Sequence, residues 1–160
     1  MSKTLVVYFS KTGEQYSVGN ITKGNTAIVA EIIAQKVGGD LFEIKVVNDN
    51  YPNTYTQLIK FAKAEKQENA RPEIAGEITN LDKYDTVFLG YPNWWSDMPM
   101  PVYTFLEKHD LSGKKVYNFC THEGSGGVHK DDFSVYGHIA QNDKELAEKQ
   151  ISEWLNHIKV

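Results

Sequence analysis

The stretch YFSKTGEQYSVGNITKGNT, residues 8–26, separates an apolar run from an apolar helical pattern, and this arrangement decides the fold. The preceding residues, Thr4–Phe9, are apolar nearly throughout, which is typical of a strand buried on both faces. Over Ala27–Val37 the apolar residues recur at helical spacing, and two glycines then end the pattern. A buried strand, a polar loop and a buried helix predict the first unit of a parallel α/β sheet.

Strand and helix patterns alternate along the rest of the chain. Further strands are predicted over Leu41–Val47, Thr86–Gly90, Lys115–Cys120 and Ser134–Ala140. Helices are predicted over Tyr55–Lys66 and Met100–Lys108. A last helix is expected to begin with Asn142 as its N-cap and Glu145 in capping-box position. This alternation predicts a parallel sheet with helices on both faces, in which ligands bind beyond the carboxyl ends of the strands.

Length and composition limit the class of protein. The chain has 160 residues, so we expect residues 1–160 to form one domain. Its net charge of 17 − 21 = −4 argues against a nucleic-acid binder, which needs a basic face. The single cysteine, Cys120, excludes an internal disulfide and fits a reducing compartment. The apolar run at the N-terminus is too short for a signal peptide or a membrane span. We therefore expect a cytoplasmic protein that does not bind membranes.

The first loop contains residues suited to a phosphate group. Ser10, Thr12, Asn25 and Thr26 can each donate a hydrogen bond, and Gly24 permits close approach of the backbone. The helix that begins near Thr26 adds free N–H groups and the positive end of its dipole. Neither GxxxxGK[ST] nor GxGxxG is present, which favours a phosphate monoester over a nucleoside triphosphate or a dinucleotide. A simple turn followed by a helix cap would explain the same residues.

A second loop, residues 91–101, contains two adjacent tryptophans. The side chains of Trp94 and Trp95 must point apart in an extended segment, so at least one is expected to border a cleft. An indole face at that position would stack on a flat aromatic ligand. The alternative is that both tryptophans lie in the core or in a dimer interface.

The third loop is THEGSGG, residues 121–127, and it offers many backbone N–H and C=O groups. Such groups can recognise the edge of a heterocycle. His122 and Glu123 do not have the spacing of a metal motif, so no metal site is expected. Cys120, at the end of the preceding strand, is expected to be a small buried residue and not a nucleophile.

A flat heterocycle with a phosphate monoester tail, as in FMN, would match all three loops. The chain resembles flavodoxin-like proteins, of the group whose phosphate motif is split by an insertion. The resemblance covers nearly the whole chain to Gly127 and resumes in the last helix. It rests on Ser10–Gly13 with Gly24–Thr26, on GYPNWWSDMPMPVYTFLE and on FCTHEGSGG. It implies a doubly wound, five-stranded parallel sheet of strand order 2-1-3-4-5.

The resemblance also implies which residues contact FMN. Those of the phosphate site are Ser10, Lys11, Thr12, Gly24, Asn25 and Thr26. Those that border the isoalloxazine ring are Pro92, Asn93, Trp94 and Trp95. Those at the other edge of the ring are Thr121, Glu123, Gly124, Ser125 and Gly126.

The chain departs from the family pattern in two places. Glu14–Lys23 is inserted in the phosphate motif and is expected to form a flap near the site. Before the last strand, only Val128–Phe133 is available where the family usually has a helix, so the fourth crossover is expected to be shortened. A sheet face left uncovered there would favour a dimer, and both a monomer and a homodimer remain open.

The leading functional interpretation is a redox flavoprotein that passes electrons through FMN to a redox partner protein. The alternative is an NAD(P)H-dependent reductase that uses FMN to reduce a quinone or nitroaromatic substrate. A non-catalytic binding module of the same fold is a further alternative. Residues 91–101 and 120–127 contain Asp97 and Glu123 but no Lys or Arg. This distribution of charge predicts a lowered flavin potential.

Overall fold

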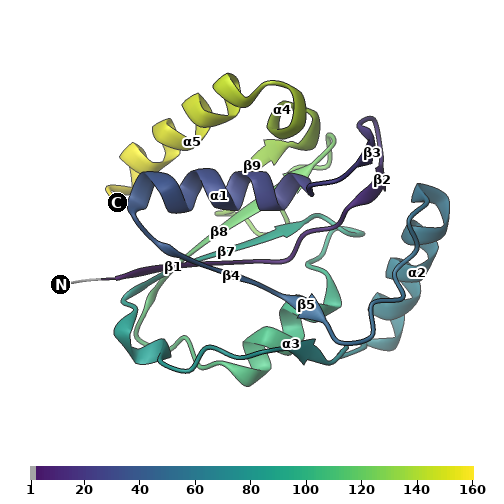
Figure 1. Cartoon of the computed structure of the whole chain (residues 1–160), viewed down its shortest axis with the longest axis horizontal. Helices are drawn as coiled ribbons and strands as arrows, with labels where there is room; N and C mark the ends of the chain where they lie inside the picture. Colours follow the sequence, from purple (N-terminus) through teal and green to yellow (C-terminus); the bar gives the residue numbers. More distant parts are fainter. Residues whose placement is uncertain (1–2) are drawn as a thin grey trace.

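Five parallel strands form the central sheet. The computed structural model describes residues 3–160 (Figure 1). The strands are β1 (Thr4–Tyr8), β4 (Asp40–Glu43), β7 (Thr86–Pro92), β8 (Lys115–His122) and β9 (Phe133–Tyr136). They pair in the order β4-β1-β7-β8-β9, and every pairing is parallel. This is the strand order 2-1-3-4-5 that the resemblance to flavodoxin-like proteins implies, so the doubly wound α/β fold is confirmed.

Each face of the sheet has its own hydrophobic core. Helices α1 (Asn25–Val37), α4 (Gly137–Asn142) and α5 (Lys144–Ile158) lie on one face, and α3 (Met100–Lys108) lies on the other (Figure 1). Successive strand residues point to opposite faces. In β1, Val6 therefore packs with residues of α1 and α5, whereas Val7 packs with residues of α3.

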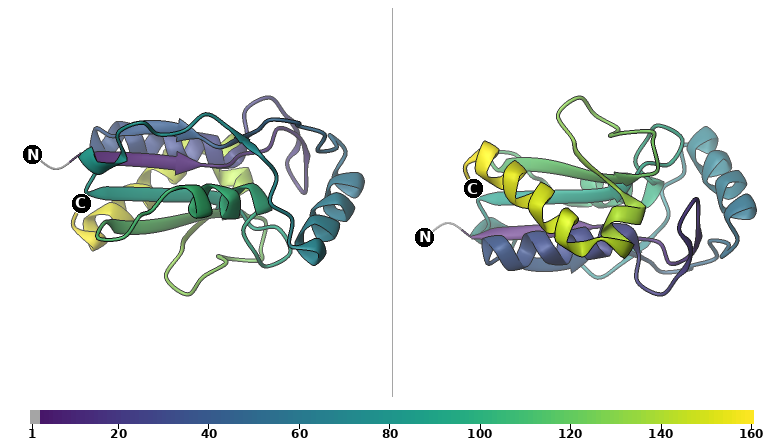
Figure 2. Two further views of the ribbon diagram at one scale, coloured as in Figure 1. Left: turned by 90° about the horizontal axis from the view of Figure 1, so that it is seen from below. Right: turned by 90° about the horizontal axis from the view of Figure 1, so that it is seen from above.

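Helix α2 (Tyr55–Glu68) does not cover either face of the sheet. It stands beyond the carboxyl ends of the strands (Figures 1 and 2). Leu58 and Ala62 of this helix are buried, and Leu58 joins the core on the α3 side of the sheet. The chain returns to β7 through β6 (Ile74–Ala75) and the 3₁₀ helix η1 (Leu81–Lys83).

Two smaller strand pairs flank the sheet. The insertion in the phosphate motif forms a hairpin of β2 (Gly13–Gln15) and β3 (Gly19–Ile21). The predicted strand Leu41–Val47 is split at Ile44, because β5 (Lys45–Val46) leaves the main sheet and pairs antiparallel with β6.

The predicted strand Ser134–Ala140 is wrong in its second half, where α4 begins at Gly137. The cause is a contact with the third loop, because the Glu123 carboxylate accepts a hydrogen bond from the backbone N–H of His138 at 2.6 Å. Gly137 also packs tightly, since a Cβ at this position would lie 2.4 Å from Nδ2 of Asn25. These contacts turn the chain into a helix after Tyr136.

The fourth crossover is shortened, as predicted. Residues 123–132, between β8 and β9, contain no helix and form a loop that projects from the sheet (Figure 2). None of the helices within residues 3–160 combines the length and apolar character that a membrane crossing requires.

The N-cap of α5 is Asp143, so the prediction of Asn142 is wrong by one residue. The Asp143 carboxylate accepts a hydrogen bond from the backbone N–H of Leu146 at 3.2 Å, whereas Asn142 ends α4 and is exposed. We expect Asp143→Ala to lower the free energy of unfolding by about 1 kcal/mol and Asn142→Ala to leave it nearly unchanged. Urea denaturation of both variants tests this, and a larger loss for Asn142→Ala would contradict the assignment.

Candidate functional site

A cavity of about 390 Å³ lies at the carboxyl ends of the strands. Its walls come from the hairpin β2–β3, the start of α1, helix α2, and the loops that follow β7 and β8. Figure 1 shows these elements grouped at one end of the sheet. The cavity therefore lies where the strand order predicts a ligand site.

The structure brings most of the predicted ring-contacting residues together around this cavity. The predicted residues that line it are Asn25, Pro92, Asn93, Trp94, Trp95, Thr121, Glu123 and Ser125. The remaining predicted residues do not line it directly: Ser10, Lys11, Thr12, Gly24, Thr26, Gly124 and Gly126.

The two halves of the split phosphate motif meet at the start of α1. The Ser10 hydroxyl oxygen accepts a hydrogen bond from the backbone N–H of Ala27 at 3.0 Å. Gly24 makes this contact possible, because a Cβ there would lie 1.9 Å from Oγ of Ser10. Within residues 3–160, the backbone amides of Asn25 and Thr26 have no hydrogen-bond acceptor. Two free amides at a helix N-terminus suit an anion.

The side chain of Asn25 also suits a ligand. Its amide oxygen Oδ1 is buried and has no hydrogen-bond partner among the described residues. Because buried polar atoms are nearly always paired, an unpaired one at a cavity wall points to a ligand donor such as a hydroxyl. Asn25 lines the cavity, and its Oδ1 is an unpaired acceptor next to the free amides of its own helix.

Thr26 links the phosphate half of the site to the third loop. Its side chain is buried, and its Oγ1 lies 2.7 Å from Oγ1 of Thr121. A hydroxyl can donate one hydrogen bond and accept two. Thr26 can therefore accept from Thr121 and still donate to an anion.

Lys11 and Thr12 differ in how they are held. The Lys11 ammonium donates to Oδ1 of Asn53 at 3.1 Å and to the backbone oxygen of Thr12 at 2.7 Å. Partial burial lowers the pKa of Lys11, and the nearby Asp49 carboxylate opposes that shift. The side chain of Thr12 is exposed. Lys11 thus holds the loop before α2, whereas the Thr12 hydroxyl is free to turn toward a ligand.

The second loop contains a tight turn. Trp94 and Asp97 exchange backbone hydrogen bonds at 2.9 and 3.2 Å, and the residues between them, Trp95 and Ser96, have left-handed φ angles of 59° and 61°. Such angles cost about 1–3 kcal/mol each in non-glycine residues and are concentrated at functional sites. The turn therefore needs support from outside the loop.

Helix α2 supplies that support through Trp95. The indole Nε1–H donates to the backbone oxygen of Ile59 at 2.7 Å, and the Lys63 ammonium lies 5.2 Å from the ring centroid. The Lys66 ammonium donates to the backbone oxygen of Trp95 at 2.6 Å. These contacts attach the strained turn to the helix.

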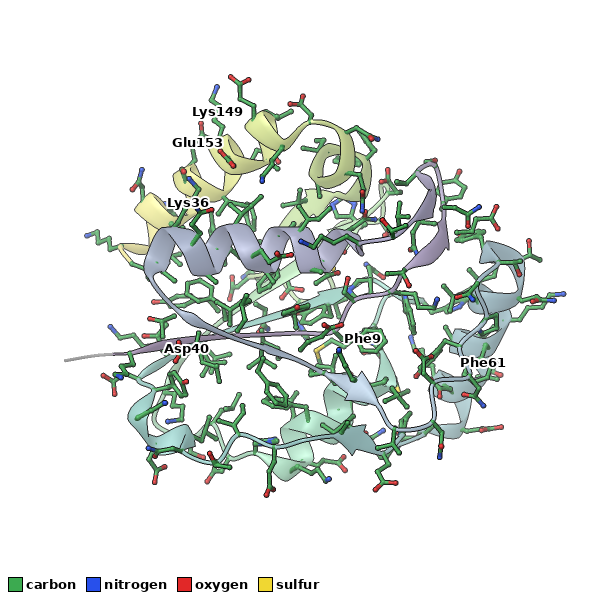
Figure 3. All side chains as sticks on the ribbon, in the orientation of Figure 1. Phe9, Lys36, Asp40, Phe61, Lys149 and Glu153 are labelled. Carbon is green, nitrogen blue, oxygen red and sulfur yellow. The ribbon has the colours of Figure 1, made fainter. Side chains whose placement is uncertain are left out.

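The two tryptophans point apart, as the sequence predicts. Trp94 packs against Phe9 and Tyr51, with ring centroids 5.4 and 5.6 Å away, whereas residue Trp95 is 44% exposed. Figure 3 shows Phe9, just past β1, and Phe61 of α2 at the same end of the molecule. Trp94 therefore connects the core to the cavity wall, and Trp95 forms the rim.

The third loop is held by its own side chains. Nδ1 of His122 accepts a hydrogen bond from the backbone N–H of Gly124 at 2.9 Å. Glu123 lines the cavity and also binds His138, whose Nδ1 lies 2.7 Å from the carboxylate. The backbone oxygen of Gly126 accepts from Nδ2 of Asn93 at 2.9 Å, which ties the third loop to the second. Burial raises the pKa of Cys120 to about 12, so its thiol stays protonated.

Sequence reasoning missed the wall that α2 contributes. The cavity residues that it did not identify as site residues are Gln15, Tyr16, Tyr55, Leu58, Ile59, Ala62, Ser96 and His122. The sequence of α2 contains no signal for this wall, because Tyr55, Leu58, Ile59 and Ala62 have the spacing of an ordinary core-facing helix. The flap expected from the insertion does lie at the site, since Gln15 and Tyr16 line the cavity.

Known proteins resemble this chain in sequence and in fold. Residues 3–158 match the family described as flavodoxin, and no curated protein matches the chain. A provisionally assigned flavoprotein from Bacteroides eggerthii is 32% identical, with 100% of this chain and 99% of that chain covered and a TM-score of 0.73. A flavoprotein in complex with FMN from Lactobacillus acidophilus is 26% identical over 82% of this chain and 81% of that chain, with a TM-score of 0.65. An FMN-dependent NADH-azoreductase from Bacillus anthracis shares the fold alone, at 12% identity and a TM-score of 0.51 over 99% of both chains.

His122 should remain neutral to a lower pH than an ordinary histidine. Burial lowers its pKa, and the neighbouring Glu123 opposes that shift only in part. An imidazolium Nδ1 cannot accept from the Gly124 amide, so this hydrogen bond should break as the pH falls through the His122 pKa. In an NMR titration we expect a His122 midpoint below its ordinary value of about 6.5, with the Gly124 amide shift following it. His122→Gln identifies the resonance, and a midpoint above 6.5 would contradict the prediction.

Proposed function

We propose that this chain, which belongs to the flavodoxin family, binds FMN and transfers electrons through the bound flavin. One observation carries the proposal: the loops after β1, β7 and β8 meet at one cavity, beside two free amides at the start of α1. The FMN complex of the Lactobacillus acidophilus relative adds support. We expect a redox partner protein to supply or accept the electrons.

FMN supplies the one- and two-electron redox chemistry when it is bound, and the residues of the chain bind and orient it. The amides of Asn25 and Thr26 would hold the phosphate, with the Thr12 hydroxyl as a further donor. Trp94 and Asn93 would border one side of the ring. The third loop would present backbone groups to the ring edge, because Glu123 turns its carboxylate toward His138.

A reductase of small aromatic molecules is the second candidate. The observation that favours it is the aromatic wall of the cavity, where Tyr16 and Tyr55 lie with ring centroids 5.5 Å apart and Trp95 forms the rim. Aromatic faces hold flat molecules such as quinones and nitroaromatics by stacking. In this case the cavity would hold a substrate next to the flavin.

The Thr12 hydroxyl should contribute to phosphate binding. We expect Thr12→Ala to weaken FMN binding by about 1.5–3 kcal/mol, the value of a charge-assisted hydrogen bond, and to leave riboflavin binding unchanged. Thr12→Ser keeps the hydroxyl and should bind FMN normally. Titration of the apoprotein with each flavin measures both affinities. An equal loss for FMN and riboflavin would place the phosphate elsewhere.

Anaerobic mixing with NADH or NADPH separates the two candidate functions. After the protein is loaded with FMN and unbound FMN is removed, its spectrum should show visible flavin absorption bands. The absence of these bands would refute the proposal itself. A carrier should keep its oxidised spectrum in the presence of NAD(P)H and be bleached by dithionite. The bleached protein should then reduce cytochrome c. Rapid bleaching by NAD(P)H alone, followed by steady turnover with a quinone, would instead establish the reductase.

A further inference from the structure

A carboxylate with no exposed surface lies at the base of the third loop. Oδ2 of Asp132 accepts hydrogen bonds from the Tyr91 hydroxyl at 2.7 Å and from the backbone N–H groups of Val128 and His129 at 3.0 and 3.1 Å. Its Oδ1 lies 3.2 Å from Nδ1 of His129. Burial of a carboxylate costs free energy unless its oxygens are paired, and here both oxygens have partners.

The position of Asp132 matters because this crossover has no helix. Residues 123–132 lack the secondary structure that would otherwise fix them to the sheet. Asp132 binds two backbone amides of the segment and reaches back to Tyr91, near the carboxyl end of the central strand β7. The packing is close, since a Cβ on Gly127 would lie 2.8 Å from Cβ of Asp132. Asp132 therefore anchors the C-terminal half of the segment to the sheet, and His129 adds a second contact because its Nδ1 lies 3.0 Å from the Tyr91 hydroxyl.

The same anchor reaches the second loop. Tyr91 is completely buried and is followed directly by Pro92 and Asn93, which line the cavity. Asn93 joins the two loops again, because its Nδ2 donates to the backbone oxygen of Gly126 and its backbone N–H donates to that of Thr121, both at 2.9 Å. Burial, followed by the hydrogen bond to Asp132, raises the pKa of Tyr91, so its hydroxyl remains a donor.

We propose that Asp132 and Tyr91 are positioning residues that fix the second and third loops in the geometry that receives the flavin ring. The proposal rests on the FMN-binding function proposed above. Neither residue lines the cavity. Their effect on the flavin is therefore indirect, through the loops that they hold, and it concerns the ring and not the phosphate.

The chain offers a matched control for the Tyr91 hydroxyl. Tyr84 is also buried, and its hydroxyl donates to Oδ2 of Asp40 at 2.6 Å. Asp40 is the first residue of β4 and lies at the opposite end of the sheet from Phe9 (Figure 3). Tyr91→Phe and Tyr84→Phe thus each remove a hydrogen bond from a tyrosine to an aspartate, at opposite ends of one sheet, and Tyr91→Phe also removes the 3.0 Å contact with Nδ1 of His129.

Flavin titrations of the two variants test the proposal. We expect Tyr91→Phe to weaken FMN and riboflavin binding by the same factor, about tenfold, because the ring contacts are affected and the phosphate contacts are not. The midpoint potential and the absorption band of the bound flavin should shift as well. Tyr84→Phe should bind both flavins like the wild type. Wild-type affinity and potential in Tyr91→Phe, or an equal loss in Tyr84→Phe, would overturn the proposal.

Hydrogen exchange of the apoproteins tests the anchor without any flavin. Tyr91→Phe should increase amide exchange in residues 123–132, and Tyr84→Phe should not. If the wild type failed to bind FMN, the proposed function would be refuted. The exchange measurement would still test whether Tyr91 and Asp132 hold residues 123–132. Unchanged exchange in Tyr91→Phe would refute the anchoring role. If Asp132→Asn folds, it should increase amide exchange in residues 123–132 more than Tyr91→Phe does. If Asp132→Asn does not fold, the result for Tyr91→Phe alone tests the anchoring role.

Discussion

The contact between Ser10 and the first turn of α1 is the interaction on which the site depends. The hairpin insertion separates the end of β1 from the start of this helix by more than ten residues of sequence. The Ser10 hydroxyl rejoins them by accepting from the Ala27 amide, and Gly24 leaves the necessary space. Because this bond uses the third amide of the helix, the first two remain available at the point where the strands end.

The insertion also determines where α2 stands. The Glu14 carboxylate of the hairpin accepts from the backbone N–H of Tyr55 at 2.7 Å, and the Glu14 backbone N–H donates to Asn53 at 2.9 Å. This contact places an acid at the N-terminus of α2, where it stabilises the helix dipole. Helix α2 in turn holds the strained turn at Trp95. A continuous set of contacts thus runs from the phosphate half of the site to the ring half.

Local patterns predict the alternating strands and helices of a parallel sheet, whereas the strand order follows from the family resemblance, and non-local contacts explain the errors. The helix Met100–Lys108 was predicted with its observed bounds, because its apolar spacing and its early proline are local features. The strand predicted to Ala140 ended early because Glu123, in a different loop, binds the amide of His138. The predicted loops do meet at the cavity, whereas the wall from α2 depends on a tertiary position that periodicity does not encode.

The partners of the two acidic residues at the site also come from distant parts of the sequence. Asp97 and Glu123, with no Lys or Arg in their loops, suggested an uncompensated negative site and a lowered flavin potential. In the fold, the Lys66 ammonium of α2 comes within 3.9 Å of Asp97, and His138 binds Glu123. The carboxylates therefore have partners that come from other elements. Lys66 offsets part of the Asp97 charge, whereas a neutral His138 would leave the Glu123 charge in place, so the lowered flavin potential stays a prediction.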